Sequence, residues 1–217
     1  MAKPGTPSKM STEGSPRSAD TRRSLVEAAI ETLKIEGFGG TSARAIAERA
    51  GLNQGLIFYH FGSVLELLLA ALDAVSDERM LKFGAAVNSA ATPAELTDIA
   101  VHIFQEDLDS GHVTVLAEMI AGASSTPGLG VEVAARLGPW FTFAENAIEK
   151  SFGDSPLSSL VPSSDVAYVI VALYLGVEML THLDGNRESA LRVFGHAQQL
   201  VALLGAFSML TPPRATT

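Results

Sequence analysis

The chain has 217 residues, of which 47% are hydrophobic, and this is enough apolar material for a medium domain with a buried core and a second, small domain. It contains no cysteine, which excludes disulfides, thiolate metal sites and cysteine nucleophiles. The net charge is −9, but residues 1–62 hold eight Lys and Arg against six Asp and Glu, whereas the remainder holds seven against eighteen. A basic end joined to an acidic body is typical of a protein that meets a polyanion with one end only.

The two termini are expected to lie outside the folded part of the chain. Residues 1–19 mix Pro, Gly, Ser and Thr with a few charges and lack the apolar run of a signal peptide, so they should form a disordered arm. Residues 211–217 should form a short tail. The longest uncharged apolar run, 166–177, covers about half of the ~20 residues that a membrane span needs. This run therefore favours a buried helix over a membrane span, and no membrane partner is expected. The expected location of the protein is the cytoplasm.

Strand signals are nearly absent, so the chain is predicted to be all-α with about nine helices. The first helix is expected over residues 21–36 and ends at Gly37. Two short helices should follow. Thr41 is expected to cap the first of them, and Asn53 the second, which ends before Gly62.

Two later helix starts carry a capping signal. In Ser63-Val64-Leu65-Glu66 and in Thr92-Pro93-Ala94-Glu95, a hydroxyl precedes a Glu by three residues, so the two side chains can satisfy free amides reciprocally. The first signal opens a long helix that ends near residue 87. The remaining helices are expected over residues 93–111, 112–123, 131–152, 164–183 and 187–209. Pro139 can kink or divide the third of these.

Residues 41–61, TSARAIAERAGLNQGLIFYHF, carry the strongest functional signal. Two short helices meet at a tight turn, as in a helix-turn-helix, and apolar residues are spaced so that the helices pack together. The side chains left outside suit a DNA major groove, because Arg can bridge guanine, Gln or Asn can pair with adenine, and glycine permits close approach. The candidate DNA contacts are Thr41, Ser42, Arg44, Asn53, Gln54, Gly55, Tyr59, His60 and Ser63. Arg44 could instead pair with Glu48, and His60 could be structural or position a phosphate.

This segment resembles the TetR/AcrR family, whose members share a first helix that ends at Gly, a T-x-x-x-I-A-x-x-A-G turn and a recognition helix that ends L-Y-x-H-F. The resemblance covers about residues 20–75, and the matching positions are Thr41, Ile46, Ala47, Ala50, Gly51, Gly55, His60 and Phe61. It implies a DNA-binding domain over residues 20–62, and a ligand-binding and dimerisation domain over residues 63–210. It also implies a homodimer that binds a palindromic operator and is usually a repressor relieved by a small-molecule ligand.

Two positions depart from the family pattern. Phe58 stands where the family has a Tyr whose hydroxyl usually touches phosphate, although Tyr59 could replace it. Val64 stands where the family has a Lys at the start of the fourth helix. The helix N-terminus with Ser63 still offers an anion site, but one charged phosphate contact per subunit is missing. The bases of the arm, Lys3, Lys9 and Arg17, could compensate.

The resemblance implies that the last two helices pair with those of a second copy as a four-helix bundle. The final helix supports this independently, because it presents an apolar stripe at helical spacing. The residues assigned to this interface are Leu191, Phe194, Gln198, Val201 and Gly205.

Candidate effector contacts are polar or aromatic groups in apolar helices. Glu178 and His182 lie four residues apart near Tyr174, and they either bind an effector or pair with each other at the dimer seam. Glu118 faces either a cationic or hydroxylated effector or solvent, and Trp140 belongs either to a pocket or to the core. The full candidate set is His102, Phe104, Glu118, Trp140, Phe143, Tyr174, Glu178 and His182. Together these residues suggest a largely apolar effector with one or two polar handles.

No metal spacing, phosphate loop or catalytic dyad is found, so no cofactor, metal site or enzymatic activity is expected. Two alternatives to a ligand-relieved repressor remain open on the sequence alone. One is an activator, or a repressor that needs a corepressor. The other is a small-molecule binding protein or an enzyme that retains the DNA-binding head as a relic.

Overall fold

The structure, a computed structural model, describes residues 16–152 and 160–210. All regular secondary structure in these residues is α-helical, which confirms the predicted all-α fold. The helices are α1 (Pro16–Gly40), α2 (Ala43–Ala50), α3 (Gly55–Phe61), α4 (Val64–Ser89), α5 (Pro93–Ser110), α6 (His112–Ala123), α7 (Leu129–Arg136), α8 (Gly138–Phe152), α9 (Ser163–Asp184) and α10 (Arg187–Leu210).

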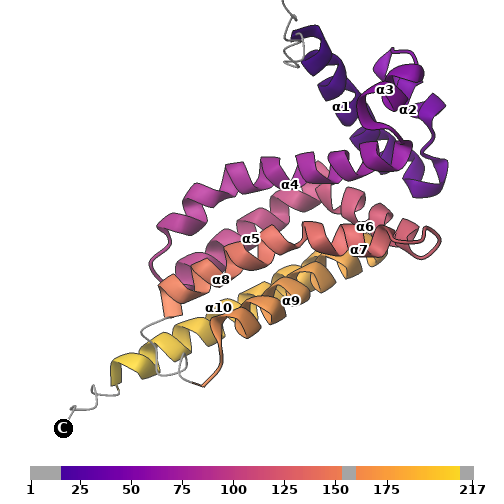
Figure 1. Cartoon of the computed structure of the whole chain (residues 1–217). Helices are drawn as coiled ribbons and strands as arrows, with labels where there is room; N and C mark the ends of the chain where they lie inside the picture. Colours follow the sequence, from indigo (N-terminus) through magenta and orange to yellow (C-terminus); the bar gives the residue numbers. More distant parts are fainter. Residues whose placement is uncertain (1–15, 153–159, 211–217) are drawn as a thin grey trace, which may run out of the picture.

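The helices form a small head at one end of an elongated body (Figure 1). Helices α1, α2 and α3 make the head, and α4 leads from it along the length of the body. Helices α5 to α10 pack beneath α4, and the C-terminal end of α10 lies at the far end from the head. The head therefore projects from the body, where a large partner can reach it.

One hydrophobic core joins the head to the body. In the head, Leu25 and Leu33 of α1 pack with Ile46 of α2, and all three are fully buried. The same cluster continues through Leu67 of α4 to Met119 of α6. Because this core is continuous, the head is held at a defined orientation to the body. The core does not divide at residue 62, so the domain boundary placed there stays a prediction from sequence.

The first helix is longer than expected at both ends. It begins at Pro16, so residues 16–19, assigned to the disordered arm, are helical. The rest of that arm and the tail over residues 211–217 lie outside the described residues. At its other end the helix kinks at Gly37, whose φ of 69° and ψ of 176° are not helical. Such a positive φ favours glycine. The helix was predicted to end at Gly37, but it bends there instead and continues to residue 40.

The caps of the two short helices differ in part from the prediction. Ser42, not Thr41, is the N-cap of α2, since its backbone is extended and its Oγ accepts a hydrogen bond from the Ala45 amide. The Thr41 hydroxyl instead donates to the Gly37 carbonyl at 2.6 Å, at the kink of α1. The N-cap of α3 is Gln54, not Asn53, and Gln54 makes no side-chain capping bond. Asn53 still supports the start of the helix, because its side-chain oxygen accepts a hydrogen bond from the Gly55 amide at 2.8 Å.

The helix expected over residues 131–152 is two helices, α7 and α8, which meet at Leu137. Pro139 is the second residue of α8, where a missing amide hydrogen and a fixed φ are tolerated. The division redirects the chain, so that Trp140 and Phe143 of α8 turn toward the interior of the body.

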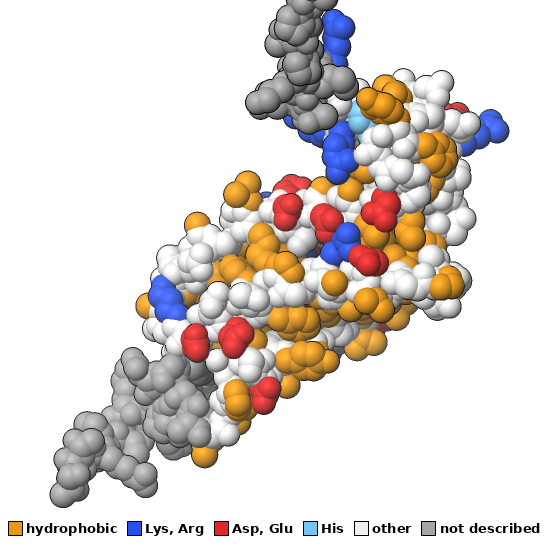
Figure 2. Space-filling view, in the orientation of Figure 1, with side chains coloured by type: hydrophobic (Ala, Val, Ile, Leu, Met, Phe, Trp, Pro, Cys, Tyr) orange, Lys and Arg blue, Asp and Glu red, His pale blue; other side chains and the backbone are white. Residues whose placement is uncertain are grey.

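Helix α9 is the one single helix, among the residues described, that is long and apolar enough to cross a membrane by length and composition alone. Most of its residues are not buried within the chain, although one side packs against α8. Its exposed apolar side chains include Val169, Leu173 and Leu180. Figure 2 shows hydrophobic side chains gathered along the side of the body where α8 and α9 run. Helix α9 therefore presents an apolar face that the chain itself does not cover.

Candidate DNA-binding head and effector cavity

Helix α3 has the exposure pattern of a recognition helix. Ile57 and Phe61 point into the core, whereas Tyr59 is 80% exposed and Phe58 is 51% exposed. Gln54, just before the helix, is exposed as well. The structure thus presents a short helix with polar and aromatic side chains on its outer surface, as direct contact with base edges requires.

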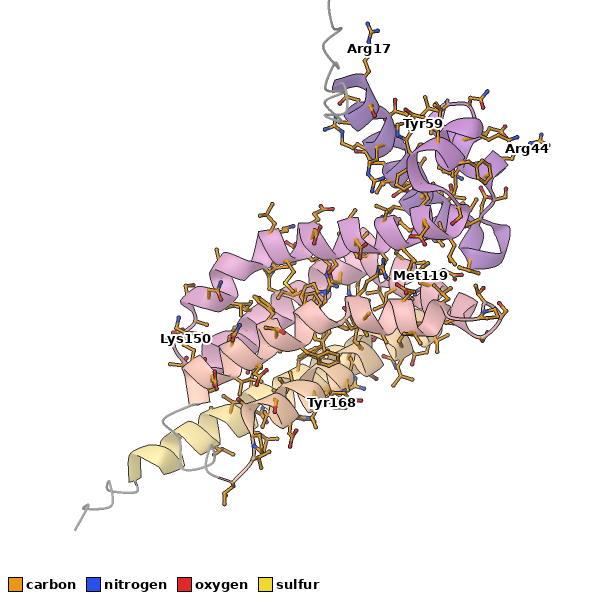
Figure 3. The ribbon with its side chains drawn as sticks, viewed as in Figure 1. Arg17, Arg44, Tyr59, Met119, Lys150 and Tyr168 are labelled. Atoms are coloured by element: carbon orange, nitrogen blue, oxygen red, sulfur yellow. The ribbon has the colours of Figure 1, made fainter. Side chains whose placement is uncertain are left out.

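The exposed face of α2 adds Ser42 and Arg44 to this surface. Figure 3 shows the Arg44 side chain extending away from the head, and no ion pair ties it to Glu48 among the residues described. Arg49 behaves differently, because it bonds to the Thr32 hydroxyl and pairs with Glu36 at 2.9 Å. Arg44 is therefore available for a partner, whereas Arg49 fastens α2 to α1.

His60 is held in place by its neighbours. Its ring meets the rings of Tyr59 and Phe61 edge-on, and its carbonyl accepts a hydrogen bond from Arg22 at 3.3 Å. The same guanidinium lies 4.3 Å from the centre of the Phe61 ring. These contacts anchor the end of α3 to α1 and suit a structural or phosphate-positioning residue better than a base reader.

The phosphate site expected at the start of α4 is formed by backbone and a hydroxyl. Ser63 caps the helix, since its Oγ accepts from the Glu66 amide at 3.1 Å, and Val64 is the first helical residue. The free amides of this N-terminus can bind an anion, but Val64 adds no charge to them.

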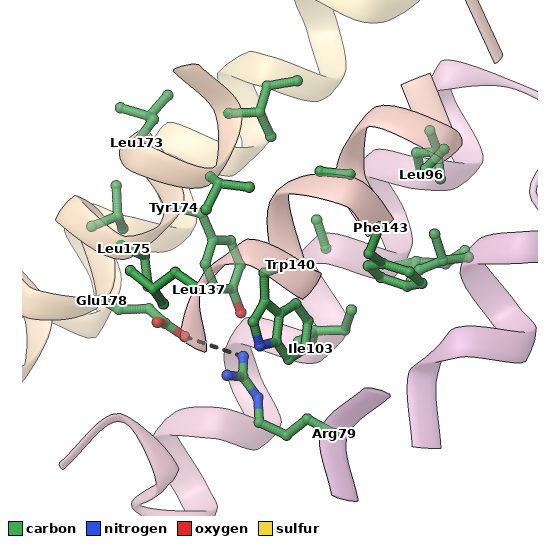
Figure 4. A pocket seen from close by; sticks show the side chains of 18 of the residues that line it. Arg79, Leu96, Ile103, Leu137, Trp140, Phe143, Leu173, Tyr174, Leu175 and Glu178 are labelled. Atoms are coloured by element: carbon green, nitrogen blue, oxygen red, sulfur yellow. Dashed lines mark ion pairs between the residues drawn. The ribbon is translucent and has the colours of Figure 1, made fainter. Parts of the chain in front are cut away.

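The body contains a cavity of about 370 Å³, partly open to the surface and lined by residues of helices α4 to α10 (Figure 4). Most of its wall is apolar, with aromatic rings from Trp140, Phe143, Tyr174 and Phe194. Its volume lies within the range of small-molecule sites. The cavity can therefore accommodate a compact, largely apolar molecule.

A buried polar cluster, made of Arg79, Asp107, Tyr174 and Glu178, stands at one end of the cavity. Arg79 of α4 pairs with Asp107 of α5, and the Tyr174 hydroxyl donates to the same Asp107 carboxylate at 2.9 Å. The Glu178 carboxyl lies 3.9 Å from the Arg79 guanidinium. Figure 4 shows Arg79, Tyr174 and Glu178 converging near Trp140. The polar cluster thus joins α4, α5 and α9 at the cavity wall.

Burial dominates the electrostatics of the polar cluster. It raises the pKa of Glu178 from 4.5 to about 8, with Arg79 opposing the rise and the Asp107 charge adding to it. Burial also raises the pKa of Tyr174 well above its ordinary value, helped by the charges of Glu178 and Asp107. The pKa of His112, which also lines the cavity, is lowered mainly by burial. At neutral pH the cluster therefore holds a neutral Glu178 beside the charged pair of Arg79 and Asp107.

Four of the eight predicted effector contacts line the cavity: Trp140, Phe143, Tyr174 and Glu178. The Trp140 indole donates to the Ser76 hydroxyl at 2.8 Å, and its ring lies 4.6 Å from the Arg79 guanidinium. Sequence reasoning missed Arg79 and Asp107, which no local motif marks and which meet only because α4 and α5 pack together.

The other four candidates do not line the cavity. His102 is on the surface beside Glu106, and Phe104 is buried behind Tyr174 and Phe194. His182 is exposed and does not meet Glu178, although the two lie one helical turn apart. Glu118 accepts a hydrogen bond from the Phe38 amide at 2.7 Å, and so binds the head instead of a ligand or solvent.

The stripe assigned to the dimer interface faces inward instead. Phe194 and Val201 line the cavity, and Gln198 donates to Asp98 of α5. Leu191 is half-buried, and the side of the helix around Gly205 lies outside the described side chains. Because α10 is apolar on two faces, its periodicity could not tell which face packs on the chain itself. The exposed apolar residues of α10 are Val193, Leu200 and Leu203.

Comparison with known proteins agrees with the geometry of the head. The model of the bacterial regulatory proteins of the tetR family matches residues 25–71. Residues 25–71 are thus similar to the DNA-binding segment of the tetR family. The HTH-type transcriptional regulatory protein RaaS of Mycobacterium tuberculosis is 43% identical over 75 residues. That match covers 34% of this chain and 35% of RaaS.

A second curated relative, the HTH-type transcriptional regulator SrpR of Pseudomonas putida, is 34% identical over 53 residues, or 24% of this chain and 25% of SrpR. The chain thus matches about a quarter to two fifths of the length of its curated relatives. This similarity is concentrated in the TetR-type head, and it does not describe the body.

Solved structures extend the likeness in fold to the body. A TetR-family regulator from Rhodococcus sp. superposes with a TM-score of 0.72 at 20% identity, over 84% of this chain and 98% of that one. The regulator FadR of Bacillus subtilis, solved with stearoyl-CoA, gives a TM-score of 0.69 at 12% identity, over 82% of this chain and 96% of FadR. The TetR-type fold therefore spans head and body.

Proposed function

We propose that this protein is a transcriptional regulator that binds a specific DNA operator through its TetR-type head. The observation that carries this proposal is the outward face of α3, where Gln54, Gly55 and Tyr59 stand exposed on a short helix anchored by buried residues. Ser42 and Arg44 extend this surface along α2. The remaining proposed contacts are Thr41, Asn53, His60 and Ser63. A regulator of this kind acts on the chromosome, in the cytoplasm.

The proposed regulator works as a homodimer. The exposed apolar residues of α9 repeat at three- and four-residue spacing as Val169, Leu173, Leu180 and Leu183, with Gly176 in the middle. Those of α10, Val193, Leu200 and Leu203, lie seven and three residues apart and so share one face of the helix as well. Such stripes on two adjacent helices suit a four-helix bundle with the same two helices of a second copy. A dimer would hold two recognition helices about one DNA turn (~34 Å) apart and would require a palindromic operator.

We further propose that a small, largely apolar effector binds in the cavity and relieves repression. The apolar wall with one polar end supports this, since such cavities are the usual form of ligand sites. FadR of B. subtilis, which shares the fold, was solved with stearoyl-CoA, a ligand with a long apolar chain. To act, the effector must favour one of two conformations by a coupling free energy of ~1–3 kcal/mol.

Selection of bound DNA from a random library, with the full chain, tests DNA binding. We expect a single palindromic motif to be enriched. The variant with both Arg44→Ala and Gln54→Ala should lose that motif while it keeps the dimeric state. Arg192→Ala, which removes an exposed Arg of the body that pairs with Glu188, is the matched control and should bind like the unaltered protein. No enriched motif, or normal binding by the double variant, would show the assignment to be wrong.

A further inference from the structure

The polar cluster holds two buried carboxyl groups and only one buried cation. Asp107 and Glu178 are both 1% exposed, and the Arg79 guanidinium faces both of them. Asp107 has the closer ion pair with Arg79 and also the hydrogen bond from Tyr174, whereas Glu178 has only the looser ion pair at 3.9 Å. Oε1 of Glu178 has no hydrogen-bond partner, although it is buried and Glu178 lines the cavity. An unsatisfied buried oxygen of this kind is costly unless a ligand satisfies it.

No other charged group at the cavity balances this second carboxyl among the residues described. Arg136 of α7 lies at the wall, but it pairs with Asp73 at 2.9 Å and with Glu132 at 2.9 Å. His112 of α6 is kept uncharged by burial, which lowers its pKa, and the more exposed Glu78 and Lys34 lie near it. Helices α8 and α10 present only uncharged side chains to the cavity. With both acids ionised, the polar cluster therefore carries a net charge of −1.

We propose that the effector is an amphipathic cation, whose positive group binds against the Glu178 carboxylate and whose apolar part fills the cavity. This inference rests on the proposed effector-binding function and names its ligand class. The positive group restores charge balance in the polar cluster, in a low-dielectric surrounding where an unbalanced charge is expensive. The aromatic rings of Trp140, Phe143 and Phe194 attract a cation through their faces. An anionic group would add a second negative charge beside Arg79 while Glu178 is protonated, and a third once Glu178 ionises.

Because Glu178 titrates, the pH dependence of binding distinguishes a cationic ligand from a neutral one. Before a cation binds, Glu178 holds a proton at neutral pH, because burial raises its pKa to about 8. A cation binds the ionised form, so its apparent affinity scales with the ionised fraction of Glu178. That affinity should fall about tenfold for each pH unit below 8 and level off above it. A neutral ligand leaves the proton in place and should bind with nearly the same affinity across this range.

The sole tryptophan of the chain, Trp140, reports binding, since it lines the cavity and its ring lies against the Arg79 guanidinium. Decyltrimethylammonium, 1-decanol and decanoate share one chain length and differ in the charge of the head group. The fluorescence of the full-length protein is titrated with each of them between pH 6 and pH 9. At pH 8 the cation should bind at least tenfold more tightly than the other two, and only its affinity should show the rise with pH.

Glu178→Gln keeps the size of the side chain but removes its charge. We expect this variant to lose at least tenfold in affinity for decyltrimethylammonium, together with the pH dependence, and to keep its affinity for 1-decanol. Glu106→Gln, a partly exposed acid of α5 that pairs with Lys82 and does not line the cavity, is the matched control and should behave like the unaltered protein.

Equal or tighter binding of 1-decanol or decanoate would overturn the proposed cation while leaving an effector cavity in place. An unchanged affinity of Glu178→Gln for the cation would also overturn it. If none of the three probes changes the Trp140 fluorescence, both the cation and the effector role of the cavity are rejected. The selection of bound DNA would still decide the DNA-binding function on its own.

Discussion

At the scale of single residues, Glu178 links the stability of the fold to pH. Its carboxyl holds a proton far more tightly in the folded state, with a pKa of about 8, than in the unfolded chain, where 4.5 is ordinary. The folded state thus binds more protons than the unfolded state between these values, so its free energy of unfolding falls as the pH rises from about 4.5 to 8. This stabilisation is complete below 4.5 and lost above 8.

Glu178→Gln should remove this part of the pH dependence, because an amide does not titrate. Urea unfolding of both proteins at pH 5, 6.5 and 8 gives the comparison, provided that the slope against urea stays constant. We expect the unaltered protein to lose stability relative to the variant as the pH rises. Glu106→Gln should keep the pH dependence of the unaltered protein. A constant difference between Glu178→Gln and the unaltered protein would contradict the raised pKa.

Val64 leaves the start of α4 without a charged side chain, at a point where the proposed DNA contact would lie. A Lys there would add a charge beside the free amides of the helix N-terminus, within reach of a DNA phosphate. We expect Val64→Lys to tighten operator binding at low salt and to steepen the log–log dependence on salt by ~0.9 for each added contact, hence by about twice that for a dimer. Fluorescence anisotropy with operator DNA over a range of salt concentrations measures this slope. An unchanged slope would place residue 64 away from the phosphates.

At the scale of helices, the sequence predicted most of the fold because the signals that begin and end helices are local. The starts of α6 and α10 and the Ser63 cap of α4 lie where the sequence placed them. The predicted helix ends and caps were wrong where the conformation depends on contacts with neighbouring segments of the chain. Whether Thr41 or Ser42 caps α2 depends on the kink at Gly37, which fixes Thr41 against the end of α1.

Helix α6 connects the cavity of the body to the head. At one end Val113 and Leu116 line the cavity. At the other end the Glu118 carboxylate accepts from the Phe38 amide, and Gly122 lies directly under the Phe38 ring. A shift of α6 in response to a ligand would thus be passed to the end of α1 and to the head.

Gly122→Ala tests the contact between α6 and the head. A Cβ at this position would lie 2.5 Å from atoms of the Phe38 ring, so the ring must move. We expect a loss of ~1–3 kcal/mol in stability, as for other overpacked sites, and weaker operator binding, with the dimer intact. Thermal unfolding and anisotropy with operator DNA measure the two effects.

Gly84→Ala is the matched control for this substitution. Gly84 lies within α4 and has open space around its Cα, so Ala should raise stability by ~0.5–1 kcal/mol through helix propensity and leave DNA binding unchanged. If Gly122→Ala and Gly84→Ala behave alike, the contact of Phe38 with α6 does not position the head.

At the scale of the whole molecule, the candidate sites differ in how far the sequence could predict them. The surface of the head comes from one continuous segment, so residues such as Arg44 and Gln54 could be placed from local pattern alone. The polar cluster is assembled from α4, α5 and α9, which are far apart in sequence. Glu178 and Tyr174 stood out as polar groups in an apolar helix, but nothing local marked Arg79 and Asp107 as their partners.

The apolar face of α9 and α10 is also a property of the whole molecule, because only packing decides which side of each helix stays exposed. Leu173 is 60% exposed, and it stands one turn from Val169 and close to Gly176, at the middle of the stripe on α9. A second copy that pairs through this face would bury Leu173 in an apolar bundle. A carboxylate there would be buried without a partner, at a cost of several kcal/mol per subunit.

Leu173→Glu should therefore turn the dimer into a monomer and abolish tight operator binding, because one head alone makes half of the DNA contacts. Sedimentation equilibrium gives the mass, and anisotropy gives the DNA affinity. Leu81→Glu is the matched control: Leu81 is 87% exposed on α4, so the same change should leave both the dimer and DNA binding intact. If the unaltered protein is a monomer, or binds lipid vesicles through α9, the proposed dimer face is wrong.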